Sequence, residues 1–188
     1  MNTHPTLLKA LDSVLVIVDM QTTLSSVMPE NEAQCMHENT LSLLEAAKKL
    51  SIPVLVTEQY PQGLGHTEIQ INDALPDYAQ LFDKTAFSSS SASGFMPTLE
   101  KTGRKQIILV GQEAHVCILQ TALDLTAQGF QVHVVEDAIC ARKTEHKFFA
   151  LQRMQSQHII ITNYESVLFE WLRDASHPDF RAISGLLR

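Results

Sequence analysis

The chain has 188 residues, and 45% of them are hydrophobic, which is enough for one sizeable core. Its net charge is −7 and no basic run occurs, so we expect no nucleic-acid-binding surface. We expect no membrane span, because every apolar stretch is too short, and no signal peptide, because the N-terminus lacks a basic region. Three cysteines without CxxC spacing argue against a disulfide framework or a zinc site and favour a reducing, cytoplasmic setting.

Short aliphatic runs predict strands that are buried on both faces of a parallel sheet. Between them, apolar residues recur with the helical period of about 3.6 residues. The predicted strands cover residues 14–18, 54–56, 81–84, 107–110, 132–135 and 158–161. The predicted helices cover residues 32–50, 91–102, 117–128, 144–155 and 164–174, with a short helix from Pro178.

This alternation of strands and helices predicts the α/β fold class. We expect a three-layer α/β/α sandwich with a mostly parallel, Rossmann-like sheet of about six strands and right-handed crossovers. No internal repeat or interdomain linker occurs, so residues 1–188 are expected to form a single domain. Its core would cover about 12–175, followed by a C-terminal tail at 176–188.

Asp19 directly follows the first predicted strand. A carboxylate at the C-terminal end of such a strand lies where α/β folds bind their ligands. The alternative is a local role, in which Asp19 caps the next segment by accepting hydrogen bonds from the N–H groups around Thr22.

Prolines and glycines break the pattern after the second predicted strand, where residues 57–84 read mainly as a long loop. Long loops at strand ends are often functional, and we expect Tyr60 and Leu64 to line a substrate pocket. Gln21 and Phe87 are further candidates for this pocket. A lysine such as Lys84 is ordinarily a solvated surface charge. It gains significance only if the fold brings it to the other candidate residues.

Cys117 lies where the fourth predicted strand passes into a helix. The unpaired N–H groups and the dipole at a helix N-terminus stabilise a thiolate, but the local pattern alone favours the alternative that Cys117 is a small buried apolar residue. If strands 14–18 and 107–110 pair at the sheet centre, the strand order reverses between them. Asp19 and Cys117 would then meet in the crevice where such folds bind ligands.

Three segments of the chain resemble the isochorismatase-like cysteine hydrolase superfamily in their order and separation. They are VLVIVDMQ with Asp19, FDKTAFS with Lys84, and LVGQEAHVCI with Cys117. The further segments EQYPQGLG, GQEAHVCILQTALDL and NYESVLFE resemble the subgroup of isochorismatase domain-containing proteins, whose physiological substrate is generally unassigned. The resemblance spans roughly residues 12 to 175.

The resemblance implies a role for each residue of an Asp–Lys–Cys triad. Cys117 would attack a carbonyl carbon, Asp19 would accept the thiol proton and return it to the leaving group, and Lys84 would keep Asp19 ionised. The backbone N–H groups of Glu113 and Cys117 would form an oxyanion hole. The family also carries a cis peptide bond before the nucleophile, which maps here between Gln112 and Glu113.

Departures from related families narrow the expected chemistry. Isochorismatases proper lack the cysteine nucleophile, so Cys117 favours hydrolysis of an amide-type C–N bond. Nicotinamidases carry an Asp-x-His…His metal site, whereas this chain has Glu58-Gln59-Tyr60 there and His66 as the nearby histidine. We therefore expect no metal and no other cofactor. His115 could line the pocket, act as a second base, or serve as a hydrogen-bonded structural group.

We thus expect a hydrolase that forms a thioester on Cys117 from a small-molecule substrate. Two alternatives stay open: a binding or scaffold protein without useful turnover, and a thiol sensor in which Cys140 approaches Cys117. The resemblance also implies a homo-oligomer, a dimer or tetramer. Apolar residues near the C-terminus, Trp171 and Leu172 with Phe169, could serve an interface or simply pack in the core.

Overall fold

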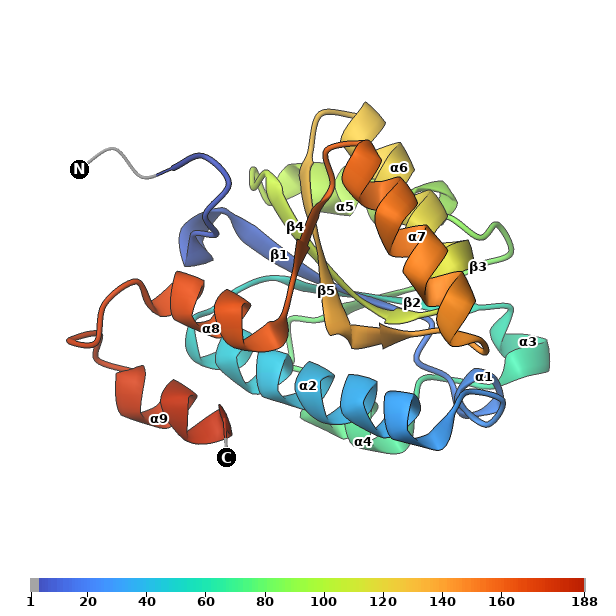
Figure 1. The fold of residues 1–188 in the computed structure, drawn as a ribbon, viewed down its shortest axis with the longest axis horizontal. Coiled ribbons are helices and arrows are strands. Elements are labelled where there is room, and N and C mark those ends of the chain that lie inside the picture. Colours follow the sequence, from blue (N-terminus) through green and yellow to red (C-terminus); the bar gives the residue numbers. More distant parts are fainter. Residues whose placement is uncertain (1–3, 188) are drawn as a thin grey trace.

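The computed structural model describes residues 4–187, so the ends of the expected domain, residues 1–3 and 188, lie outside the described part. Six parallel strands form one sheet in the order β3-β2-β1-β4-β5-β6 (Figure 1). The strands are β1 (Ser13–Val18), β2 (Val54–Gln59), β3 (Gln80–Lys84), β4 (Gln106–Gln112), β5 (Gln131–Cys140) and β6 (Ile160–Thr162). The predicted α/β fold with a Rossmann-like sheet is confirmed.

Helices cover both faces of this sheet. They are α1 (Thr22–Ser25), α2 (Glu30–Lys49), α3 (Pro61–Leu64), α4 (Ile69–Ala74), α5 (Phe95–Lys101), α6 (Leu119–Ala127), α7 (Thr144–Ser156), α8 (Tyr164–Leu172) and α9 (Phe180–Ser184). Short 3-10 turns form η1 (Ala10–Asp12), η2 (Ser89–Ser91) and η4 (Gly185–Leu187), and a wide, π-type turn forms η3 (Ala114–Ile118). Among the described residues, no helix is long and apolar enough to cross a membrane.

Two apolar clusters separate the three layers. Alternate residues of the central strands point to opposite faces, so Leu15 and Ile17 pack toward α2 and α8, while Val14 and Val16 pack toward α5, α6 and α7. In Figure 1, α2, α8 and α9 lie on one side of the sheet, and α5, α6 and α7 lie on the other. The central strands are buried along their whole length, which explains their unbroken aliphatic sequences.

The strand order reverses between β1 and β4, as the sequence predicts. After β1 the chain adds β2 and β3 on one side, and it then crosses over to β4 on the other. The last residue of β1, Val18, pairs with Gly111 of β4. The segments that follow these strands therefore diverge from one point and open a crevice at the C-terminal edge of the sheet.

The structure corrects several boundaries. Strand β5 continues through Glu136 and Asp137 to Cys140, and its register against β4 shifts between Leu109 and Gly111. The region 57–84 is more regular than expected, because β2 runs to Gln59 and two short helices, α3 and α4, follow it. Helix α5 begins later than residue 91, since η2 and a left-handed Gly94 precede it.

Candidate active site

Asp19 occupies a sharp turn at the end of β1. Its backbone is left-handed (φ 53°), a conformation that aspartate tolerates better than most residues. Its N–H donates to the carbonyl of Thr57 at 3.0 Å, and its own carbonyl accepts from Gln21 N–H at 2.9 Å and from Gln112 Nε2 at 3.0 Å. Neighbouring strands thus fix the main chain of Asp19 and direct its carboxylate into the crevice.

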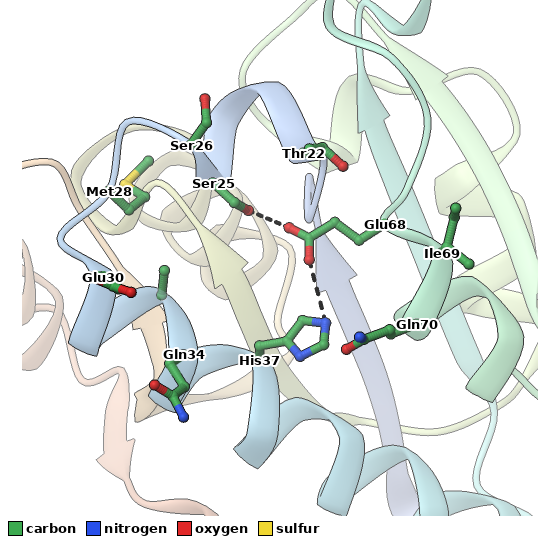
Figure 2. A pocket seen from close by; sticks show the side chains of 11 residues that line it. Thr22, Ser25, Ser26, Met28, Glu30, Gln34, His37, Glu68, Ile69 and Gln70 are labelled. Carbon is green, nitrogen blue, oxygen red and sulfur yellow. Dashed lines mark hydrogen bonds and ion pairs between the residues drawn. The ribbon is translucent and has the colours of Figure 1, made fainter.

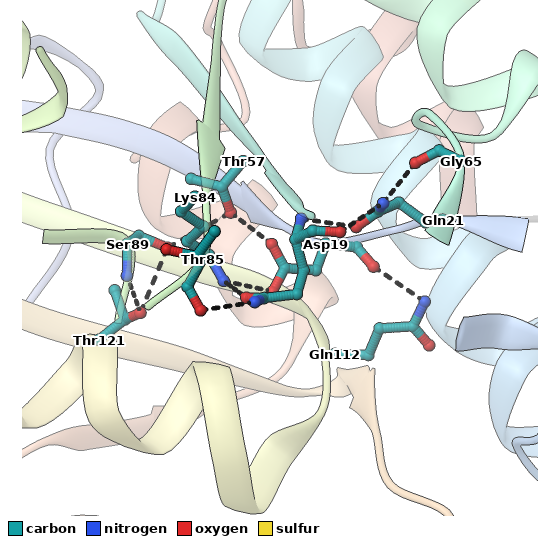
Figure 3. A network of polar contacts seen from close by, with 10 residues as sticks. Asp19, Gln21, Thr57, Gly65, Lys84, Thr85, Ser89, Gln112 and Thr121 are labelled. Carbon is teal, nitrogen blue, oxygen red and sulfur yellow. Dashed lines mark hydrogen bonds and ion pairs between the residues drawn. The ribbon is translucent and has the colours of Figure 1, made fainter. Parts of the chain in front are cut away.

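Asp19 and Lys84 form an ion pair in which both side chains are fully buried (Figure 3). Lys84 Nζ lies 2.7 Å from Asp19 Oδ2 and donates a second hydrogen bond of 2.6 Å to Gln59 Oε1. Gln59 is itself oriented by a 2.8 Å bond from its Nε2 to the carbonyl of Thr85. The hydroxyl of Thr57 donates to Asp19 Oδ1 at 2.8 Å. Both carboxylate oxygens therefore have donors, as a buried charge requires.

A chain of buried hydroxyls continues from this carboxylate toward α6 (Figure 3). Thr57 Oγ1 lies 3.4 Å from Ser89 Oγ, and Thr121 Oγ1 donates to Ser89 Oγ at 3.2 Å. The chain is anchored on the backbone, because Ser89 N–H donates to Thr121 Oγ1 at 2.8 Å. These contacts hold the side of Asp19 that faces away from Lys84.

Cys117 lies in the wide turn η3, between β4 and α6, and is only 5% exposed. Its thiol lies within hydrogen-bonding reach of both Asp19 and Lys84. The fold therefore brings together the three residues that the sequence marks as a triad, from the ends of β1, β3 and β4.

Burial raises the pKa of the Cys117 thiol to about 12, and the charge of Asp19 adds to the rise while Lys84 opposes it. The expectation that the helix N-terminus favours a thiolate is therefore wrong for the resting site, because desolvation outweighs it. Burial likewise raises the pKa of Asp19, against the opposing charge of Lys84. A proton that passes from the thiol to the carboxylate leaves the net charge of this buried group unchanged.

A cavity of about 460 Å³ opens beside Cys117. Its lining residues are Leu24, Gln59, Tyr60, Leu64, Thr85, Phe87, Glu113, Val116 and Cys117. Three of the predicted pocket residues, Tyr60, Leu64 and Phe87, are among them. Sequence reasoning missed four lining residues, Leu24, Gln59, Thr85 and Val116. The signal for Gln59 and Thr85 was only their position close to the ends of two predicted strands.

Two predicted pocket residues do not line this cavity. Gln21 is fully buried, and its amide binds the main chain of Gln59 and Gly65 instead. The ring of His115 lies against that of His146, with 4.5 Å between their centroids. Both side chains are therefore structural contacts in this geometry.

The segment before Cys117 has the expected backbone form, with a cis peptide bond between Gln112 and Glu113. Glu113 and Cys117, the two residues expected to supply oxyanion-hole N–H groups, both line the cavity. The histidine that follows β2, His66, bonds Glu58 at 2.9 Å. The described residues contain no group of three or more histidine, cysteine, aspartate or glutamate side chains arranged to hold a metal ion.

A second cavity, of about 770 Å³, lies between α1, α2 and the start of α4 (Figure 2). Within this cavity, the carboxylate of Glu68 accepts a hydrogen bond from the hydroxyl of Ser25. Its other oxygen lies 3.3 Å from Nε2 of His37. Ser25 Oγ also accepts a 2.8 Å hydrogen bond from Gln112 Nε2. The hydroxyl of Ser25 donates to the carboxylate of Glu68 rather than to His37. In a serine hydrolase the nucleophile donates to the histidine, so this group does not have that arrangement.

The family model described as the isochorismatase domain matches residues 13–166. The chain belongs to the isochorismatase family. Isochorismatase domain-containing protein 1 of Salmo salar is 42% identical over 146 residues, which are 78% of this chain and 51% of that relative. The chain thus spans about half the length of the curated isochorismatase domain-containing proteins 1 that it matches.

Other similar proteins match over more of their length. The secreted isochorismatase effector Isc1 of Phytophthora sojae is 36% identical over 184 residues, which are 94% of this chain and 84% of that protein. The structure described as MAR1 ribonuclease from Caenorhabditis elegans superposes with a TM-score of 0.90 at 36% identity, covering 96% of this chain and 91% of that one. The fold is thus that of an isochorismatase-family hydrolase.

Proposed function

We propose that this chain is a cysteine hydrolase that cleaves an amide-type C–N bond of a small molecule, with Asp19, Lys84 and Cys117 as its triad. The observation that carries the proposal is the buried contact of these three side chains beside a cavity into which Cys117 faces. A nucleophile, an adjacent base and a group that orients the base are the minimum set for covalent acyl transfer.

In the first half of the reaction, Cys117 Sγ bonds to the carbonyl carbon of R–CO–NH–R′ while its proton passes to Asp19. The oxyanion is held by the backbone N–H groups of Glu113 and Cys117, and one such donor contributes about 100-fold or more in rate. Asp19 then gives its proton to the nitrogen as the C–N bond breaks. The amine R′NH₂ leaves, and the acyl group remains as a thioester.

In the second half, Asp19 takes a proton from water as the water oxygen attacks the thioester carbon. Collapse of this intermediate breaks the C–S bond, and the thiol recovers its proton from Asp19. The products are a carboxylic acid and an amine, and one water is consumed. Lys84, fixed by Gln59, offsets the negative charge in each state of the cycle.

A panel of small amides tests the proposal by comparing the wild type with Cys117→Ala. We expect amine release that falls at least about 100-fold in the variant, together with an acyl adduct on Cys117 in the wild type by mass spectrometry. Cys35→Ala is the matched control, because that cysteine is exposed on α2 and should leave turnover unchanged. Turnover that persists in Cys117→Ala would refute the role of the thiol.

Two other functions find less support. In a thiol sensor, Cys140 would resolve an oxidised Cys117, but these cysteines belong to the apolar clusters on opposite faces of the sheet. The relative described as a ribonuclease suggests RNA, but the net charge of −7 opposes binding to a phosphate backbone. An RNA oligonucleotide in the same panel is expected to stay intact.

We also propose a homo-oligomer, a dimer or tetramer, in a reducing, cytoplasmic setting. Trp171 and Leu172 are buried in the core and are not available to an interface. Phe148 and Phe149 on α7 are instead 54% and 65% exposed and pack against each other, which is the kind of surface that assembly covers. Light scattering of the purified chain would detect the assembly, and a monomer mass would refute it.

A further inference from the structure

We infer that the substrate enters this site with an uncharged, apolar acyl group, aromatic or branched aliphatic, and that amides carrying a carboxylate are rejected. The inference rests on the proposed function for the bond that is cleaved. The selectivity for neutral ligands rests on the cavity alone.

The wall of the cavity is apolar and comes from four separate segments. Leu24 belongs to α1, Leu64 to α3, Phe87 to the segment after β3, and Val116 to the turn η3. The ring of Tyr60 completes this wall, and Tyr60 and Phe87 are each 52% exposed. Half-exposed aromatic rings that face one cavity gain most from an apolar partner, because its binding removes their surface from water.

No side-chain cation lines this cavity among the described residues. Lys84, which lies beside the lining residue Gln59, is fully buried and already bonds Asp19 and Gln59. The only carboxylate in the lining, Glu113, bonds Arg142 Nε at 2.9 Å. A ligand carboxylate would therefore lose water without gaining a partner and would also meet the charge of Glu113.

The polar groups of the cavity lie close to the triad. Gln59 binds Lys84, and Thr85 accepts from Gln59 through its carbonyl, so both belong to the network around Asp19. This arrangement places the amide of a ligand near Cys117 and its acyl group against the apolar wall. A volume of about 460 Å³ accommodates a small molecule of this kind.

Binding to Cys117→Ala, measured by calorimetry, tests the inference without turnover. The probes are two matched pairs: benzamide with 4-carboxybenzamide, and 3-methylbutanamide with glutaric acid monoamide. We expect each neutral amide to bind at least about tenfold more tightly than its anionic partner. Equal or tighter binding of the anionic probes, or no binding of either neutral amide at millimolar concentration, would overturn the inference.

A charge placed on the wall should reverse this preference. In the Cys117→Ala background, Leu64→Arg is expected to raise the affinity for 4-carboxybenzamide and to lower that for benzamide. Phe87→Arg is the second variant, because its half-exposed position tolerates a charge. The control is Leu11→Arg, which adds the same charge in η1, where Leu11 is 86% exposed, and should change neither affinity. An unchanged preference in both wall variants would count against the inference.

Turnover separates this inference from the proposed function. If the wild type hydrolyses no amide while the neutral probes still bind selectively, the function fails and the inference about the cavity stands. If amides are hydrolysed but anionic probes bind equally well, the function stands and the inference fails.

Discussion

Asp19 and Cys117 are two acids that share a buried site with one ammonium group, that of Lys84. Burial raises the pKa of both acids while the charge of Lys84 opposes the rise, so a state in which only one of the two acids is ionised balances the ammonium group. The raised pKa keeps the thiol of Cys117 neutral in the resting site. In the proposed reaction, an internal proton transfer to Asp19, rather than loss of a proton to solvent, then produces the nucleophile.

The variant Asp19→Asn should therefore slow hydrolysis but speed the alkylation of Cys117. Hydrolysis is expected to fall at least about 100-fold, because the base and the proton donor are lost. The pKa of Cys117 is expected to fall below its wild-type value, because the charge that raises it is removed while Lys84 remains. Alkylation of Cys117 by iodoacetamide, followed by mass spectrometry across pH, would then be faster than in the wild type at the same pH.

Cys35 and Cys140 provide internal controls for that alkylation, since the hydrogen bonds of their thiols in the described structure go to residues other than Asp19. Their rates should be the same in both proteins. Slower labelling of Cys117 in Asp19→Asn, or hydrolysis that survives the substitution, would show that Asp19 does not control the thiol.

Among the structural elements, β4 depends on one glycine to reach the site. Gly111 has φ +112°, a value that L side chains rarely adopt, and it pairs with Val18 of β1. A Cβ atom there would lie 2.1 Å from the carbonyl oxygen of Val18. The backbones of β1 and β4 thus approach at Gly111 more closely than any side chain permits, directly beside Asp19.

Gly111→Ala should therefore destabilise the protein by several kcal/mol and abolish activity, since either the strands separate or the turn at Asp19 moves. Gly103→Ala is the matched control, because Gly103 also has a positive φ (+69°) but a Cβ atom added there would meet no other atom within 4 Å. It should cost only about 1–2 kcal/mol and leave activity intact. Denaturant unfolding and amide turnover would measure both effects. Similar losses in the two variants would exclude the close approach as the cause.

The elements that the sequence predicts well are those whose residues are buried on both faces. The aliphatic runs of β1 and β4 needed no tertiary information, and the position of Cys117 followed from the change of period after β4. The extension of β5 through Glu136 and Asp137 was missed, because local polarity reads as a strand end while pairing with β4 overrides it. Helices α3 and α4 are too short for a periodic signal.

The side chains of the site were less predictable than its strands. Asp19, Lys84 and Cys117 lie at or just after the ends of predicted strands. The predicted fold therefore places them at one edge of the sheet, and the resemblance to the family selects them as a triad. Whether Gln21 and His115 face the cavity depends on hydrogen bonds and ring contacts between distant segments, such as Gln21 with Gly65 and His115 with His146. Sequence spacing carries no information about those contacts.

At the scale of the whole molecule, His133 links stability to pH. It lies in β5, is 1% exposed, and burial lowers its pKa to about 4 from the ordinary 6.5. Between pH 4 and pH 6.5, His133 therefore binds a proton in the unfolded chain but stays neutral in the folded chain. Stability from this residue is complete above pH 6.5 and is lost as the pH falls toward 4, by at most about 3 kcal/mol.

His133→Leu should flatten the pH dependence of the free energy of unfolding between pH 6.5 and 4, because leucine takes up no proton in the unfolded chain. Chemical denaturation at a series of pH values would measure this slope. The exposed His4 supplies the control, and His4→Leu should leave the slope as in the wild type. An unaltered slope in His133→Leu would mean that other groups govern acid stability.

Lys84 is the final residue of β3, and β3 is an edge strand that pairs with β2 alone. Its ammonium reaches past β2 to the carboxylate that follows β1. Edge strands open locally at a lower free energy than the strands inside a sheet. Each such opening withdraws the cation from Asp19 while the rest of the sheet stays folded. If Lys84 acts as proposed, turnover therefore depends on an edge strand, and heat should abolish it before the core of the sheet unfolds.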